Sequence, residues 1–276
     1  MSPLYEDIFM KFDERDLYTG LSALHWATIS TSDPRRDKSF YKGILEKAGI
    51  KALELGCGAG RLLLTFLQEG FDVQGVDISG DMLSVCRQHA NAMGLDPVLY
   101  QQQMQQLDLP DRFNAIYIPC GGFQCVMGRR AALETLRRCH AHLEPGGILA
   151  FNVAPAHSFY YWGPKEIHAW PGEWKQIANK ELEDGKRLLV YHHKIFEDTV
   201  AQYAVRERRY ELYEGNRLIK EEIHTGQTHW YHRNELMWML ELAGFQDVDV
   251  KGDWTDETLN SEHEKEMIFV ATKNGK

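Results

Sequence analysis

A glycine-rich loop followed by an acidic residue is the clearest ligand-binding motif in this 276-residue sequence. Gly56, Gly58 and Gly60 lie in ALELGCGAGRLL, between an apolar run and an amphipathic stretch. Glycine tolerates positive φ and lets backbone amides approach a ligand, and amides at the start of a helix favour a polar or anionic group. Asp77 ends the next apolar run, where a carboxylate can accept hydrogen bonds from both hydroxyls of a ribose. The pattern indicates a site for a nucleotide-like cofactor.

The spacing of these glycines bears on which cofactor is bound. It is G-x-G-x-G, whereas the dinucleotide fingerprint is G-x-G-x-x-G, and Arg61 stands where the third glycine of that fingerprint would be. Glu54 precedes the loop by two residues and could receive an ammonium group or support the loop amides. A nicotinamide-dependent oxidoreductase is an alternative, because it shares the strand, the loop, the helix and the ribose acid. The absent glycine and the Pro-Gly-Gly turn in LEPGGIL count against it.

Four motifs, taken in order, resemble those of the class I S-adenosylmethionine-dependent methyltransferases: ELGCGAGR, GVDIS followed by Met82, RFNAIYIP and LEPGGIL. The resemblance extends to GQTHWYHRNELMWMLELAGF and covers most of the chain beyond Tyr41. It is closest to bacterial small-molecule enzymes with an antiparallel insertion after the fifth strand, including sugar-amine N-methyltransferases. It implies S-adenosylmethionine as cofactor, S-adenosylhomocysteine as product, and in-line transfer of a methyl group to a small-molecule acceptor, with nitrogen or oxygen favoured.

The resemblance also implies which residues hold the cofactor. The glycine loop would line its methionine part, Asp77 would hold its ribose, Ile78 and Met82 would flank its adenine, and Gln103 and Met104 would reach the edge and face of the adenine. The expected cofactor contacts are Glu54, Gly56, Cys57, Gly58, Gly60, Asp77, Ile78, Met82, Gln103, Met104, Pro119, Cys120 and Gly121.

Three positions depart from the family pattern. Gln103 stands where aspartate is common, although its carbonyl can still accept a hydrogen bond. Asn114 also replaces a common aspartate, and Gly122 stands where many relatives have serine. These departures keep a third class open, a non-catalytic protein that retains the methyltransferase fold.

Candidates for the acceptor side come from the lead-in, the insertion and the residues that follow it. His229 and Tyr231 are the expected catalytic residues, because they lie in the segment that resembles the family's substrate-facing one. The aromatic residues of the lead-in, Trp26 among them, could cover the cofactor or simply pack. The expected acceptor-binding residues are Tyr18, Tyr41, Phe123, Tyr160, Trp162 and Trp230.

Cys120 follows a proline at the end of an expected strand, as the nucleophile of cytosine carbon-five methyltransferases does. Those enzymes also use a glutamate from Glu-Asn-Val, and here the triplet is Phe151-Asn152-Val153. The glutamate is missing and no basic target-reading domain follows, so we expect Cys120 to be a packed, inert thiol.

Strands alternating with helices from residue 51 to 154 predict a doubly wound, Rossmann-like α/β sheet, mostly parallel with an antiparallel last strand. Period-two segments then predict an antiparallel β cap. We expect residues 1–154 to hold a lead-in and the first part of the core, 155–228 the cap insertion, and 229–276 the rest of the core. Expected strands cover 51–55, 72–76, 98–101, 114–119, 148–153, 187–196, 200–213, 217–228, 245–250 and 267–272, and expected helices 60–68, 80–93, 129–143 and 233–243.

The turn at Gly215-Asn216 predicts a register for the last hairpin of the cap. Glu211 would face Lys220 and Arg209 would face Glu222, on a solvated face that also takes the charged run at 206–209. The opposite, covering face would carry Tyr210, Leu212, Ile219 and Ile223.

The composition of the chain indicates which classes of binding partner and which cellular location to expect. A net charge of −9 and a pI near 5.7 count against a phosphate backbone as partner, so nucleic-acid methylation is less favoured within the class. The sequence has no apolar run long enough to span a membrane, and its N-terminus resembles neither a signal nor a transit peptide. Five cysteines without a C-x-x-C pair suggest free thiols in the cytoplasm. We expect a monomer or homodimer that needs no metal.

Overall fold

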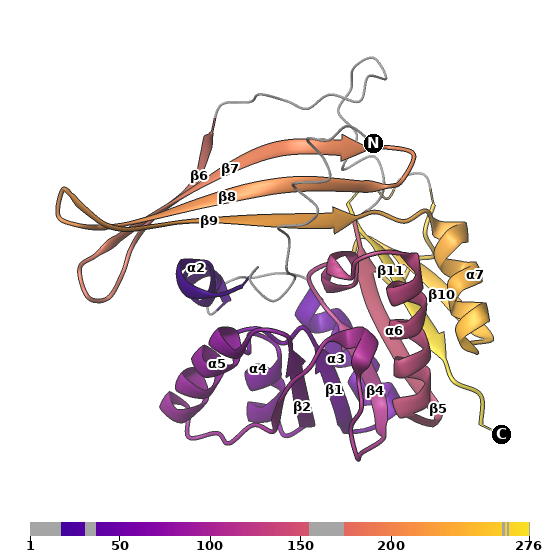
Figure 1. Ribbon diagram of the computed structural model, residues 1–276. Coiled ribbons are helices and arrows are strands. Elements are labelled where there is room, and N and C mark those ends of the chain that lie inside the picture. Colours follow the sequence, from indigo (N-terminus) through magenta and orange to yellow (C-terminus); the bar gives the residue numbers. More distant parts are fainter. Residues whose placement is uncertain (1–17, 31–36, 155–173, 261–262, 264, 276) are drawn as a thin grey trace.

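Two sheets of different kinds make up this computed structural model, which describes residues 18–30, 37–154, 174–260, 263 and 265–275 (Figure 1). The larger sheet has seven strands in the order β10-β11-β5-β4-β1-β2-β3. The bounds of its strands are β1 (Lys51–Leu55), β2 (Asp72–Asp77), β3 (Leu99–Gln101), β4 (Phe113–Ile118), β5 (Leu143–Val153), β10 (Asp247–Gly252) and β11 (Met267–Thr272). Strands β1 to β5 pair in parallel, and β11 is antiparallel to both of its neighbours. The predicted fold class is confirmed.

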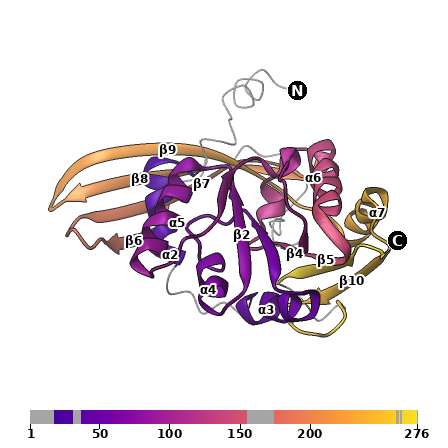
Figure 2. The same cartoon turned by 90° about the horizontal axis from the view of Figure 1, so that it is seen from below.

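Helices cover both faces of this sheet, and Figure 2 shows the two layers from below. One apolar cluster joins the sheet to α6 and α7, and a second cluster joins the opposite face to α3, α4 and α5. These helices span α3 (Asp37–Ala48), α4 (Leu63–Gln68), α5 (Gly80–Ala92), α6 (Arg129–His142) and α7 (Arg233–Ala243). None of the described helices is long and apolar enough to cross a membrane.

The strand order places a switch point between β1 and β4. The chain runs from β1 outward through β2 to β3 and then returns to β4 on the other side of β1. In open parallel sheets the connections diverge at such a point and leave a crevice beyond the carboxyl ends of the strands, where ligands bind. The glycine loop after β1 and the residues after β4 both lie at this edge.

The smaller sheet, sheet B, is antiparallel and has the order β6-β7-β8-β9. Its strands are β6 (Lys175–Glu181), β7 (Arg187–Asp198), β8 (Tyr203–Glu214) and β9 (Arg217–His229), of which β6 was not predicted. The proposed domain boundaries at 154 and 228 stay predictions.

Helix α2 (Gly20–Ser30) lies between sheet B and the larger sheet's helices (Figure 1). The Ser22 hydroxyl is 3.1 Å from the Tyr210 hydroxyl of β8, and the Leu21 amide donates to Glu222 of β9 at 2.6 Å. On the opposite side, the Gly20 amide donates to Asp81 of α5 at 2.8 Å. The helix therefore connects the two sheets, and the face of sheet B that packs on it is called the inner face below.

The predicted register of the last hairpin is wrong beyond its turn. Tyr213 pairs with Leu218 as expected, but a β-bulge follows, and Arg209 then pairs with Ile223 instead of Glu222. Because side chains alternate along a strand, the extra residue moves every following β9 side chain to the opposite face. Ile223, expected on the covering face, is 53% exposed, and Glu222 points to α2.

The predicted charge pairs across the hairpin are consequently replaced by pairs within each strand. Arg209 bonds to Glu211 at 2.9 Å on β8, and Lys220 bonds to Glu222 at 2.7 Å on β9. Ile219, also expected to be covered, is 38% exposed.

The charged run at 206–209 is divided between the two faces and does not form one solvated surface. Arg208 stacks over Trp26 of α2, with its guanidinium 5.6 Å from the ring centroid. Arg209 points to the other face, where its guanidinium is 5.0 Å from the ring centroid of Trp174.

Candidate active site

The glycine loop folds back onto the end of β2. Gly56, Gly58 and Gly60 all have positive φ, +72°, +53° and +87°, a region in which side chains are strained. The amides of Gly56 and Cys57 both donate to the carbonyl of Val76, at 2.7 and 3.0 Å. The loop therefore lies against the carboxyl end of β2, and α4 begins only at Leu63, three residues later than predicted.

Asp77 holds this loop from the second strand. One of its carboxylate oxygens accepts from the Gly58 amide at 2.8 Å, and the other from the Ser79 amide at 2.9 Å. The side chain is 8% exposed, and burial raises the pKa of this carboxyl despite the backbone amides that donate to it. Each oxygen keeps a lone pair, so the carboxylate can accept two further hydrogen bonds from a ligand.

A cavity opens at this edge of the sheet, beyond the carboxyl ends of β1 to β4. It is lined by Tyr18, Trp26, Glu54, Gly56, Cys57, Gly58, Ala59, Arg61, Val76, Asp77, Ile78, Met82, Gln102, Gln103, Met104, Gln105, Pro119, Cys120, Gly122, Cys125 and Val126. Most of the expected cofactor contacts are in this set. Gly60 and Gly121 are not: a Cβ on Gly60 would lie 2.6 Å from the sulfur of Cys86, so Gly60 serves the packing of α4 against α5.

Glu54 is a carboxyl group at the inner end of the cavity. It is 2% exposed, and its Oε2 accepts from the Tyr117 hydroxyl at 2.8 Å. Burial raises the pKa of Glu54 to about 8, against the effect of the Tyr117 hydrogen bond and of the nearby Arg61. The group can thus be neutral without a ligand and ionised next to a cation.

Arg61 is a further candidate for the functional site. In the sequence it was notable only because it stands where the dinucleotide fingerprint has a glycine. Its guanidinium makes two hydrogen bonds to the buried carboxylate of Asp37, one of them 3.1 Å long from Nη1. Nη2 also lies 3.2 Å from the sulfur of Cys120. A fixed cation therefore lines the cavity directly after the glycine loop.

Cys120 is exposed and has a φ of +57°, so the expectation of a packed thiol is wrong. The following Gly121 also has a positive φ, and this pair turns the chain sharply after β4. The side chain of Asn152 on β5 holds the turn, since its Oδ1 accepts from the Gly121 amide at 3.2 Å.

Gln124, in the short helix η3 (Gly122–Cys125), joins this turn to sheet B. Its Oε1 accepts from the Ala154 amide at 2.8 Å, and its Nε2 donates to the His229 carbonyl at 2.9 Å. The side chain is 3% exposed. It thus fixes both points where the chain passes between the larger sheet and sheet B.

The expected catalytic pair lies beside this junction. The rings of His229 and Tyr231 are stacked with their centroids 6.5 Å apart, and Tyr231 also packs on Phe123 at 5.4 Å. His229 Nε2 and the Tyr231 hydroxyl are buried and have no hydrogen-bond partner within the described residues. Burial lowers the pKa of His229, with Glu235 acting in the opposite direction. Neither side chain is among those that line the cavity, and Tyr231 is 3% exposed.

The structure separates the other expected acceptor-binding residues. Tyr18 lines the cavity, and its hydroxyl lies 3.8 Å from the sulfur of Cys125. Tyr41 is fully buried and donates to the Ile118 carbonyl at 3.2 Å, and Trp230 is fully buried against Ala204. Tyr41, Trp230 and Phe123 therefore lie in the core and not in the cavity wall. Tyr160 and Trp162 lie outside the described residues.

Some lining residues carried no sequence signal. Gln102, Gln105, Cys125 and Val126 belong to short connecting segments without a recognisable motif, and Trp26 was identified only as an aromatic residue of the lead-in. Within the part of the chain that the structure describes, no three histidine, cysteine or acidic side chains gather as a metal site.

Comparison with known proteins identifies the family. Residues 52–147 match the methyltransferase domain family. The chain is 25% identical over 94% of its length to YqeM of Bacillus subtilis (strain 168), which carries a provisional methyltransferase name and is covered over 98% of its own length.

Solved structures show the same fold. An S-adenosylmethionine-dependent methyltransferase from Clostridium acetobutylicum superimposes with a TM-score of 0.72 at 16% identity, covering 88% of this chain and 93% of that one. The sugar N-methyltransferase KedS8 from Streptoalloteichus sp. superimposes with a TM-score of 0.68 at 15% identity, covering 91% and 92%.

The domain match and the fold favour a methyltransferase over a nicotinamide-dependent oxidoreductase or a non-catalytic protein. Both the parallel sheet with its glycine loop and the added antiparallel sheet belong to this class. Residues 52–147 thus form a methyltransferase domain, and the domain match with the fold supports an S-adenosylmethionine-dependent methyltransferase with S-adenosylmethionine as cofactor.

Proposed function

We propose that this enzyme methylates a nitrogen or oxygen atom of a small molecule held between the cavity, α2 and the inner face of sheet B. The observation that carries the proposal is the position of the His229 and Tyr231 side chains. They carry buried polar atoms without hydrogen-bond partners in the described chain, and Tyr231 packs on Phe123 of η3, whose neighbours Gly122 and Cys125 line the cavity. The relative KedS8 is a sugar N-methyltransferase, which supports nitrogen as an acceptor atom.

The cavity lining fits the chemical parts of S-adenosylmethionine. Met82, Met104 and Ile78 offer apolar walls for an adenine ring, and the Asp77 carboxylate has lone pairs for ribose hydroxyls. A Cβ on Gly58 would lie 3.0 Å from Met82 Cε, so the glycine keeps this wall open. Glu54 and Arg61 could receive the ammonium and carboxylate groups of the methionine part.

The chain's own residues then have three tasks in the reaction. Bound S-adenosylmethionine would supply an activated methyl group, which would bond to the acceptor atom while the electron pair of the broken carbon–sulfur bond stays on sulfur. The protein aligns the acceptor atom and excludes water, which supplies most of the rate in such displacements. His229, neutral because burial lowers its pKa, accepts the proton that the acceptor atom releases. Tyr231 orients the acceptor through its hydroxyl.

The proposal extends to the location of the enzyme, its acceptor class and its oligomeric state. All five cysteines are free, which supports work in the cytoplasm, and the acidic net charge supports a small-molecule acceptor over a nucleic acid. We propose a monomer or a homodimer.

Two measurements test the proposal. Calorimetric titration with S-adenosylhomocysteine and with NADH should show binding of the first alone. The enzyme should then be incubated with S-adenosylmethionine and a panel of small amines and alcohols. We expect at least one of them to be methylated, with an equal amount of S-adenosylhomocysteine formed. Selective NADH binding would refute the proposal, and so would turnover on RNA or DNA with none on the panel.

A further inference from the structure

The inner face of sheet B carries a row of basic side chains across three strands. His192 and Lys194 on β7 pair in register with Arg208 and Arg206 on β8, and Arg208 pairs in turn with His224 on β9. Residues paired across antiparallel strands lie on the same face, so these five side chains share one surface.

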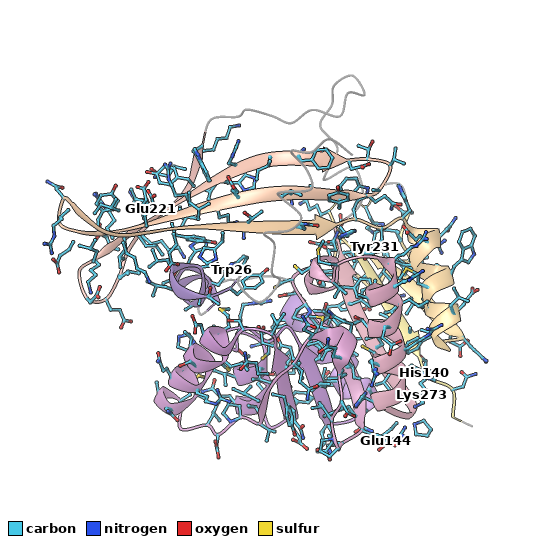
Figure 3. All side chains as sticks on the ribbon, in the orientation of Figure 1. Trp26, His140, Glu144, Glu221, Tyr231 and Lys273 are labelled. Atoms are coloured by element: carbon cyan, nitrogen blue, oxygen red, sulfur yellow. The ribbon has the colours of Figure 1, made fainter. Side chains whose placement is uncertain are left out.

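The contacts of neighbouring residues show that this is the inner face. Tyr210, two residues after Arg208, packs beside His25 of α2 with ring centroids 5.9 Å apart and lies against His224 at 5.4 Å. Figure 3 shows Trp26 on α2 below β9, on the side of sheet B that faces the larger sheet. Arg208 stacks on this tryptophan, which also lines the cavity.

Acidic side chains compensate only part of this charge. Lys194 forms an ion pair with Glu197. Glu222 already bonds to the Leu21 amide, Lys220 and His224. Arg208 has no carboxylate partner among the residues that the structure describes.

The surplus charge affects its neighbours. Burial, together with the nearby Arg206 and Arg208, lowers the pKa of His192 to about 4. Burial, with Arg208, also lowers the pKa of Arg206. The partly buried guanidinium of Arg208 is costly without a carboxylate partner in the described chain, and an anion placed beside it recovers that cost.

We infer that the acceptor carries an anionic group, a phosphate or a carboxylate, which Arg208 binds with the help of the neighbouring Arg206. This inference rests on the proposed function, because it assigns the acceptor to the space between the cavity and sheet B. The guanidinium of Arg208 lies over the Trp26 ring, and two parallel hydrogen bonds from it would fix the far end of the acceptor.

Anion binding to the enzyme saturated with S-adenosylhomocysteine tests the inference. Inorganic pyrophosphate and succinate serve as probes in calorimetry at low salt, on wild type, Arg208→Gln, Arg208→Lys and Arg217→Gln. Arg217 is the matched control, since it lies at the exposed hairpin tip of the same sheet. We expect Arg208→Gln to weaken binding by about tenfold or more, the effect of losing hydrogen bonds to a charged group. Arg208→Lys should retain part of the affinity, and Arg217→Gln all of it.

The two probes distinguish the two groups, because preference for pyrophosphate indicates a phosphate and preference for succinate a carboxylate. Equal binding by wild type and Arg208→Gln, or no binding of either probe to wild type, would overturn the inference. Affinity for S-adenosylhomocysteine is measured on every variant, so that a folding defect appears as loss of both ligands. If wild type fails to bind S-adenosylhomocysteine, the proposed function has failed, whatever the anions do.

Discussion

The two sides of the active site differ in how completely the protein satisfies its own polar groups. At the carboxyl edge of the parallel sheet, Asp77, Glu54 and Asp37 each have hydrogen-bond partners from the chain itself. Where sheet B ends, by contrast, His229 Nε2 and the Tyr231 hydroxyl are buried and have no hydrogen-bond partner in the described chain. The cofactor side is thus complete before a ligand arrives, whereas the acceptor side is left open to one.

The largest effect should follow from the acceptor side. Replacing His229 with alanine should lower kcat by about 10²-fold or more, the usual cost of a lost general base. Because burial lowers the pKa of His229, wild-type kcat should be constant above neutral pH and fall in acid, and the variant should lose that dependence. Steady-state kinetics from pH 5 to 8 measures both, with Asn234→Ala as an exposed control. Unchanged kcat in His229→Ala would remove the proposed base.

The next effect concerns the cofactor side. Asp77→Ala should weaken S-adenosylhomocysteine binding by about 1–3 kcal/mol, the cost of unmade hydrogen bonds to a charged group. Calorimetry on this variant and on Asp72→Ala, at the exposed start of the same strand, gives the comparison. Equal affinities would place the ribose elsewhere and weaken the contrast between the two sides.

Glu54 gives a stability test of the cofactor side. Its pKa in the folded protein, about 8, lies above its ordinary value of 4.5, so folding favours the protonated form. The resulting stabilisation is complete below pH 4.5 and is lost as pH rises through 8. The Tm of the ligand-free enzyme should therefore fall by several degrees between pH 5 and 8. Glu54→Gln should flatten this slope, and Glu46→Gln, on the exposed face of α3, should not. A Tm profile of Glu54→Gln that matches wild type would contradict the assignment.

The smallest effect is expected at Cys120. A serine hydroxyl can accept the Arg61 hydrogen bond that the sulfur now accepts, so Cys120→Ser should change kcat by less than about threefold. Complete loss of turnover with normal cofactor affinity would instead identify a nucleophilic thiol, and the cofactor side would then take part in the chemistry.

The sequence predicted the parallel sheet and much of the cavity lining, because both depend on local patterns. Gly56, Gly58 and Asp77 are recognisable from spacing alone, since the loop they form is built within some twenty consecutive residues. Strand β4 and helix α7 were likewise evident from their hydrophobic periodicity.

What the sequence could not predict depends on contacts between distant segments. The bulge opposite Leu212 and Tyr213 has no sequence signal, yet it decides that Glu222 and not Ile223 faces α2. Arg61 and Asp37 are separated by a stretch of chain whose path fixes their ion pair, and local patterns do not show that path. The same reason explains why Trp26 was noticed as an aromatic residue but could not be assigned to the cavity.

Gln124 has a consequence for how such enzymes diverge. Both groups that it binds, the Ala154 amide and the His229 carbonyl, belong to the backbone. Every amino acid supplies a carbonyl, and every one except proline supplies an amide. The junction therefore places almost no demand on which residues flank sheet B. An insertion of different sequence can be accepted at the same two points while the cofactor side stays unchanged, so acceptor specificity can evolve separately from cofactor binding.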